Sequence, residues 1–210
     1  MIGNELKRYQ PDSRYIVPDK ETEGLNLFAS RPWQIAWVIA DAKQVYEKEE
    51  HYLWWPDLRV SQQAAIITRF NYQLYKERAQ DPKKVLARYE ERLYDPSIKN
   101  IVGQNFFYDG YIYNVLRRLC GLPPDWSWMP RMIDTNCLSK AYRKGIQPDR
   151  ANFLAWQWKM QSIHEKLKTR LETMCGELGI PFDPHMAHDA IYDVTKTREL
   201  YEKLKWSVEF

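Results

Sequence analysis

The chain has 210 residues, enough for one domain with a substantial core, and its 44% apolar and 28% charged residues exclude a disordered chain or a coiled coil. A formal net charge of +3 is only mildly basic, so charge alone does not identify a nucleic-acid-binding protein. The N-terminus lacks an apolar signal region, and no stretch reaches the ~18 apolar residues of a membrane helix. We therefore expect a single domain, residues 1–210, in a soluble cytoplasmic protein with no membrane partner.

Cysteine and aromatic residues bear on the kind of site the chain can hold. The three cysteines are widely spaced and form no C-x-x-C pair, so reduced thiols are favoured over a zinc site. Nine Trp and fourteen Tyr raise the aromatic content to 14%. A Trp-rich core explains this content most simply, whereas a stacking surface for unpaired bases is the alternative.

The predicted elements change from strands to helices along the chain and then mix. Alternating and short apolar runs predict five strands, at residues 14–19, 32–41, 45–55, 99–103 and 131–134. Apolar residues at helical spacing predict helices that begin near residues 61, 81, 105, 167 and 188. The first three strands are joined by short loops, which favours an antiparallel meander. The whole order predicts an α/β fold, a mixed five-stranded sheet with helices on both faces, in which residues 147–165 are a candidate insertion.

Acidic residues fall at the ends of these elements. Asp19 and Glu21 end the first strand, and because residues i and i+2 of a strand point to the same face, their carboxylates project together. Asp109 lies in the first turns of the helix after the fourth strand, where an acid is also favoured by the helix dipole alone. Each feature by itself is common in proteins that bind nothing there.

The final helix carries Asp193, and His188 precedes it by five positions. Two helical residues five apart diverge by about 140°, so His188 shares a site with Asp193 only from the loop before the helix or from its very start. Pro184 blocks an earlier start, and Asp189 suits a first turn. His185 is the competing histidine at this point.

Four carboxylates that converge suit a pair of divalent cations. Such a pair stabilises the attacking and leaving oxygens of a phosphoryl displacement, and Mg²⁺ prefers oxygen ligands. A nearby His can accept the proton of the attacking water because its pKa lies near neutral pH.

Three segments of the sequence together resemble one family. DKETEGL (19–25), GQNFFYDGYIYNVL (103–116) and HDAIYDVTKTREL (188–200) resemble, in order, the three motifs of the DEDDh 3′→5′ exonucleases, the group of the bacterial proofreading epsilon subunit and RNase T. MIDTNCLSKA (132–141) and LKTRLETMCGELGI (167–180) resemble the segments between those motifs. The resemblance covers roughly residues 14–204 and implies an RNase H-like sheet in which parallel strands follow antiparallel strands 1–3.

The resemblance also implies a set of site residues. It assigns the metal-binding tetrad to Asp19, Glu21, Asp109 and Asp193 and, from its spacing, the general base to His188 rather than His185. It places the substrate on Thr22, Gly24, Leu25, Gln104, Asn105 and Tyr108. The implied activity is hydrolysis from the 3′ end of a DNA strand with release of nucleoside 5′-monophosphates, and the implied cofactors are two Mg²⁺ or Mn²⁺ ions per site. A DNA polymerase or another replication or repair protein is the implied partner class.

The sequence departs from the family pattern at three places. Pro18 lies where a strand residue is usual, so either its N–H side is unpaired or the strand is bulged before the site. Gln104 replaces a common His, and Phe106-Phe107-Tyr108 is bulkier than usual, which would narrow the pocket or stack on a base. Two alternatives stay open: an RNA-trimming exoribonuclease of the same family, and a non-catalytic nucleic-acid-binding or scaffold domain.

Overall fold

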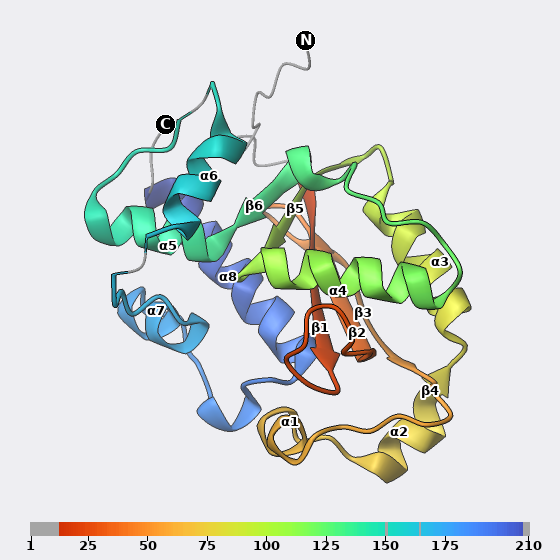
Figure 1. Cartoon of the computed structure of the whole chain (residues 1–210). Coiled ribbons are helices and arrows are strands. Elements are labelled where there is room, and N and C mark those ends of the chain that lie inside the picture. The colour runs from red at the N-terminus through yellow and green to blue at the C-terminus, as the bar shows by residue number, and fades with distance from the viewer. Residues whose placement is uncertain (1–12, 150, 164, 208–210) are drawn as a thin grey trace.

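A six-stranded mixed sheet forms the centre of the fold, with strand order β4–β3–β2–β1–β5–β6 (Figure 1). The computed structural model describes residues 13–207 except 150 and 164. Its strands are β1 (Arg14–Thr22), β2 (Pro32–Ala40), β3 (Val45–Leu53), β4 (Ala79–Gln80), β5 (Ile98–Gly103) and β6 (Met132–Asp134). β1, β2 and β3 pair antiparallel, whereas β5 runs parallel to β1 and β6 parallel to β5. The predicted α/β class and mixed sheet are confirmed.

The sheet has one strand more than the five predicted from the sequence. β4 has two residues and pairs in parallel with Tyr52 and Leu53 of β3. Two residues are too few to show an alternating pattern, and tertiary packing beside α2 (Tyr72–Arg78) sets their pairing. The five predicted strands correspond to the other members of the sheet.

Helices cover both faces of the sheet (Figure 1). On one face α3 (Pro82–Leu93) and α4 (Phe106–Leu119) pack on a core that includes Ile16. On the other face, α5 (Thr135–Lys144), α6 (Phe153–Gln161), α7 (Leu171–Glu177) and α8 (Ala190–Ser207) pack on a core that includes Tyr15 and Val17. The alternation along β1 decides which side chains face which layer, so Asp19 and Glu21 fall on the α8 side.

The segment 147–165, which carries no strong sequence pattern, contains α6. Phe153, Trp156 and Met160 of α6 are buried at helical spacing in the core on the α8 face. Gln157 is fully buried between them and bonds the backbone of β6 at both Met132 and Asp134. α6 is therefore part of the packed core.

Pro18 is accommodated where the parallel ladder has ended. β1 pairs with β5 only as far as Ile16, whereas its pairing with β2 continues through Pro18, opposite Trp37, to Thr22. The register shifts of β1 lie at Arg14/Tyr15 and Glu21/Thr22, so the strand is not bulged just before Asp19. The missing N–H of Pro18 interrupts no β1–β5 pairing.

The short helix α1 and two 3₁₀ turns lie outside these layers. α1 (Gln62–Thr68) buries none of its residues and is capped by Ser61, whose Oγ accepts from Ala64 N–H at 3.1 Å. The 3₁₀ turns at Met129–Arg131 and Pro184–Met186 lead into β6 and toward α8. Among the described residues, no helix combines the length and the apolar character needed to cross a membrane.

Candidate active site

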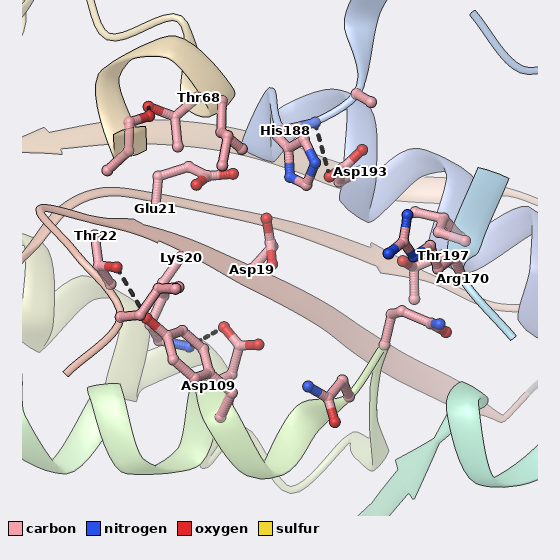
Figure 2. Close-up of a pocket in the computed structure, with 18 of the residues that line it drawn as sticks. Asp19, Lys20, Glu21, Thr22, Thr68, Asp109, Arg170, His188, Asp193 and Thr197 are labelled. Carbon is pink, nitrogen blue, oxygen red and sulfur yellow. Dashed lines mark hydrogen bonds and ion pairs between the residues drawn. The ribbon is translucent and has the colours of Figure 1, made fainter. Parts of the chain in front are cut away.

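A pocket of about 710 Å³ opens where the carboxyl end of β1 meets the starts of α4 and α8. Figure 2 shows the carboxylates and His188 around this open space. All the site residues predicted from the sequence line it: Asp19, Glu21, Thr22, Gly24, Leu25, Gln104, Asn105, Tyr108, Asp109, His188 and Asp193. His185, the competing histidine, is exposed in the preceding 3₁₀ turn and is not among the lining residues.

The start of α8 explains how His188 and Asp193 reach one pocket. Asp189 caps the helix, because its carboxylate accepts from Tyr192 N–H at 2.9 Å. His188 therefore precedes the helix, with a left-handed backbone (φ 63°), and its N–H donates to Asp193 Oδ2 at 3.1 Å. The prediction that His188 lies just before the helix is confirmed.

Asp134 fixes the start of α4, and thereby Asp109. Its buried carboxylate accepts from the N–H groups of Asn105 (3.0 Å) and Phe106 (3.1 Å), two donors that a helix N-terminus leaves unpaired. Asn105 has a left-handed backbone, φ 56°, and its own side chain does not cap the helix. Asp134 thus places the first turns of α4, including Asp109, against the end of the sheet.

Lys20 is a buried cation that sequence reasoning missed. Its side chain points to the sheet face opposite Asp19 and Glu21, and its Nζ donates to Asp109 Oδ1 at 3.4 Å. The ammonium also lies 5.2 Å from the Tyr89 ring centroid. A Lys between two predicted ligands was a visible signal, but only the helix packing shows that it reaches Asp109.

The pKa values of the pocket carboxyls reflect enclosure and mutual repulsion. Burial, followed by the charges of neighbouring pocket carboxylates, holds the pKa of Asp19 and of Glu21 well above the usual range. Burial also raises the pKa of Asp109, although Lys20 opposes the shift. Burial raises the pKa of Asp193 to about 7. The pKa of His188 is lowered, first by burial and then by Arg69.

The donor set fits a divalent cation. Ligand atoms of Glu21, His188 and Asp193 lie within 4.8 Å of one another. Asp193 Oδ1 is buried and has no hydrogen-bond partner among the described residues. A buried carboxylate oxygen normally has a partner, and a bound cation would supply one. Asp19 and Asp109 lie outside this group of three, but their carboxylates line the same pocket and add hard oxygen donors to it (Figure 2).

One wall of the pocket is formed by four of the predicted substrate residues, Thr22, Gly24, Leu25 and Tyr108. Thr22 Oγ1 donates to Gly24 O at 2.6 Å and lies 2.9 Å from the Tyr108 hydroxyl. Leu25 is 81% exposed beside them. Of the three bulky residues of the second motif only Tyr108 lines the pocket, because Phe106 is buried in the core and Phe107 packs against Trp158.

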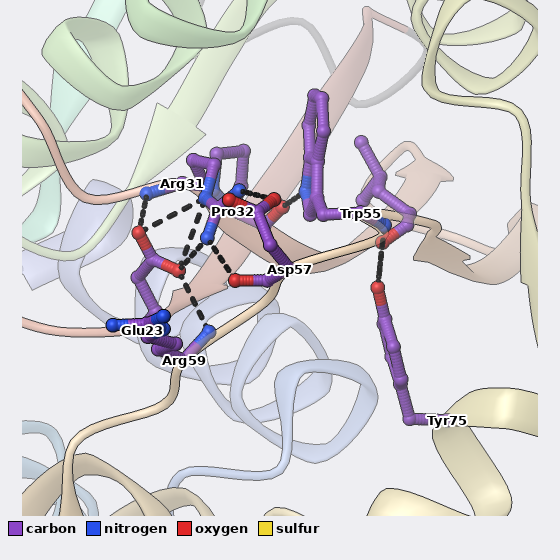
Figure 3. A network of polar contacts seen from close by, with 8 residues as sticks. Glu23, Arg31, Pro32, Trp55, Asp57, Arg59 and Tyr75 are labelled. Atoms are coloured by element: carbon purple, nitrogen blue, oxygen red, sulfur yellow. Dashed lines mark hydrogen bonds and ion pairs between the residues drawn. The ribbon is translucent and has the colours of Figure 1, made fainter.

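A charged brace joins this wall to the wall formed by α1 (Figure 3). Arg31 donates to both carboxylate oxygens of Glu23, at 3.1 and 3.0 Å, and to Asp57 Oδ1 at 2.6 Å. Glu23 O accepts from Ser61 N–H, the cap residue of α1, at 2.9 Å. The α1 residues Gln63, Ala64, Ile67 and Thr68 line the pocket, and none of them was predicted.

Arg170 is a second lining cation that was not predicted. It precedes α7 and lines the pocket together with Leu171 and Thr197 (Figure 2). The guanidinium makes no hydrogen bond or ion pair within the described part of the chain. The sequence signal was available, because Arg170 lies in the segment that resembles the helix before the third motif.

The chain has the same fold as several solved structures of E. coli Exonuclease I. Particular structures with this fold include E. coli Exonuclease I in complex with a dT13 oligonucleotide, with a TM-score of 0.70 and 22% identity over 90% of this chain. A zinc-bound E. coli Exonuclease I–ssDNA complex gives a TM-score of 0.72 and 22% identity over 92% of this chain. A product-bound exonuclease I gives a TM-score of 0.68 and 21% identity over 90% of this chain.

The match covers about nine-tenths of this chain but less than half of each of those proteins. It spans 40%, 41% and 42% of the three exonuclease chains, respectively. No protein-family model matches the sequence, and a comparison with curated proteins finds no match. The likeness to solved structures therefore establishes the fold.

Proposed function

We propose that the protein is a metal-dependent 3′→5′ exonuclease that hydrolyses single-stranded DNA and releases nucleoside 5′-monophosphates. The observation that carries the proposal is the convergence of Asp19, Glu21, Asp109, His188 and Asp193, from three separate elements, in one pocket. A domain without catalysis gains nothing from enclosing four carboxylates that repel one another without a cation.

The chain's own groups have defined parts in this reaction. Asp19, Glu21, Asp109 and Asp193 would hold two Mg²⁺ or Mn²⁺ ions, which supply Lewis-acid stabilisation of charge on the phosphate oxygens when bound. His188 lies at the pocket edge with a lowered pKa, so its imidazole is neutral at working pH and accepts the proton of the attacking water. Its left-handed backbone and its bond to Asp193 hold it beside the ligands.

A single-stranded substrate is supported by the shape and lining of the pocket. Leu25 and Ile67 bring apolar surface to it from the two walls, where a terminal unpaired base would pack. Solved structures of the same fold contain single-stranded oligonucleotides. Specificity for a free 3′ end follows if the walls leave room for one terminal nucleotide.

The test is a substrate panel with a 5′-labelled strand of one sequence as DNA and as RNA, single-stranded and duplex. We expect Mg²⁺-dependent shortening of the single-stranded DNA from its 3′ end, release of nucleoside 5′-monophosphates and loss of activity with EDTA. Faster trimming of the RNA would assign the exoribonuclease alternative. Binding of the strand without any cleavage would assign the scaffold alternative.

A further inference from the structure

A row of cations lies on the segment that joins α6 to α7. Lys166, Lys168 and Arg170 are exposed, whereas Leu167 between them is half-buried and Thr169 is buried. This alternation of burial puts the three positive side chains on the exposed side of the segment. None of the three makes a hydrogen bond or ion pair with another residue in the part of the chain that the structure describes.

The backbone of the row is fixed. Leu167 N–H donates to Glu165 O at 2.7 Å and Thr169 N–H to Leu167 O at 3.0 Å, which are tight turns of the γ type. Gln104 Nε2 donates to Thr169 O at 2.9 Å and so ties the segment to the second motif. The backbone that carries the three cations is therefore held in place before any ligand binds.

The row is continuous with the carboxylate pocket. Arg170, its last member, lines the pocket, and Figure 2 shows it beside Thr197 at the pocket edge. Arg31, Arg88 and Arg143 each form an ion pair with a glutamate. The three cations of the row form no such pair within the described residues and are therefore available to an external anion. Regular cations that lead to a phosphodiester-cleaving pocket suit successive phosphates of a strand more closely than they suit an irregular acidic peptide.

We propose that Lys166, Lys168 and Arg170 bind the phosphate backbone of the single strand on the 5′ side of the scissile nucleotide. The inference rests on the proposed function, because the 3′ nucleotide must occupy the pocket for the rest of the strand to pass over the row. The contacts are electrostatic and carry no sequence preference.

The test measures the salt dependence of binding. The full chain with Asp193→Asn, which we expect to leave the strand uncleaved, is titrated with a fluorescein-labelled oligothymidylate at several NaCl concentrations. Adding Lys166→Gln and Lys168→Gln together should make the slope of log affinity against log salt less steep by about 1.4, from about 0.7 per lost phosphate contact on a single strand. The matched control is Lys83→Gln with Lys84→Gln, an exposed pair on α3, which should leave the slope unchanged.

Two results would overturn the inference. One is an unchanged slope in the Lys166→Gln/Lys168→Gln protein, and the other is an oligoglutamate peptide that competes as well as the oligonucleotide. Hydrolysis of the p-nitrophenyl ester of thymidine 5′-monophosphate, which occupies only the pocket, separates the two proposals. If the unmodified protein fails to cleave the ester with Mg²⁺, the proposed function fails, whereas the binding slope still reports on the row.

Discussion

Among single residues, Asp193 is subject to two opposing effects: burial favours its protonated form, whereas metal binding requires its ionised form. Its carboxylate accepts the N–H of His188 through one oxygen, while the other oxygen is buried without a partner among the described residues. Burial raises its pKa to about 7, so near neutral pH the metal-free protein holds a partly protonated group where a charged ligand is required. A cation at the pocket and a proton on Asp193 therefore compete.

Replacing Asp193 with Asn should stabilise the metal-free protein in a pH-dependent way. The folded pKa is about 7 and the unfolded value is near 3.9, so the folded state retains a proton that the unfolded state releases between these values. The wild-type free energy of unfolding therefore falls as pH rises from about 4 to about 7. Asp193→Asn lacks this loss, and we expect it to be more stable by about 1–3 kcal/mol at pH 8 and almost unchanged at pH 4.

Thermal unfolding in EDTA at the two pH values measures this difference, at about 2–4 °C in Tm for each kcal/mol. Glu91→Gln, at an exposed position of α3, serves as the control and should not change Tm. A wild-type protein as stable as Asp193→Asn at pH 8 would show that the ionised Asp193 carboxylate does not destabilise the metal-free protein.

The pocket residues were predictable from sequence where local spacing decides them. Strand alternation puts Asp19 and Glu21 together. Helix geometry allows His188 to share a site with Asp193 only from the start of the helix or the loop before it, and the resemblance to the exonuclease motifs chose His188 over His185. Lys20 and Arg170 were not found, because the contact of Lys20 with Asp109 and the place of Arg170 in the pocket arise from packing between distant segments.

At the scale of elements, α1 depends on its connections. It buries no residue, yet it forms a wall of the pocket, so its position comes from the Glu23–Arg31–Asp57 brace and the Glu23–Ser61 backbone bond. A short helix without a buried face is marginal by itself. Sequence periodicity predicted a helix near Ser61 but not its position in the fold, because the helix has no buried apolar face that would indicate what it packs against.

Replacing Arg31 with Met should loosen this wall. The change leaves the half-buried Glu23 carboxylate without its cation, and we expect a loss of about 1–3 kcal/mol in the free energy of unfolding. Because the terminal nucleotide would pack between the two walls, KM for a single-stranded oligonucleotide should rise several-fold while kcat changes less. Steady-state kinetics and thermal unfolding measure the two effects.

Arg88→Met is the matched control, since it removes an arginine–glutamate pair between α3 and β3 that does not line the pocket. It should leave KM unchanged. An unchanged KM in Arg31→Met as well would show that the brace does not contribute to substrate binding.

For the whole molecule, topology decides where the site lies. The carboxyl ends of the parallel strands β1, β5 and β6 meet at one edge of the sheet, which is where open α/β sheets bind ligands. Asp109 comes from the helix layer on one face and Asp193 from the layer on the other, so neither layer alone forms the pocket. The sequence predicted the layers and most strands, whereas the edge strand β4 depended on tertiary pairing.

The most direct test of the proposed exonuclease activity is the rate at which the 3′-terminal nucleotide is released from a 5′-labelled single-stranded DNA with Mg²⁺, compared among matched variants. We expect Asp193→Asn to abolish release and His188→Ala to slow it by about 10²–10⁴-fold, because a positioned general base contributes that much. His185→Ala, which alters the nearby histidine outside the pocket, should retain the wild-type rate. Unchanged release by Asp193→Asn or His188→Ala, with the fold intact, would show that this pocket is not the catalytic centre.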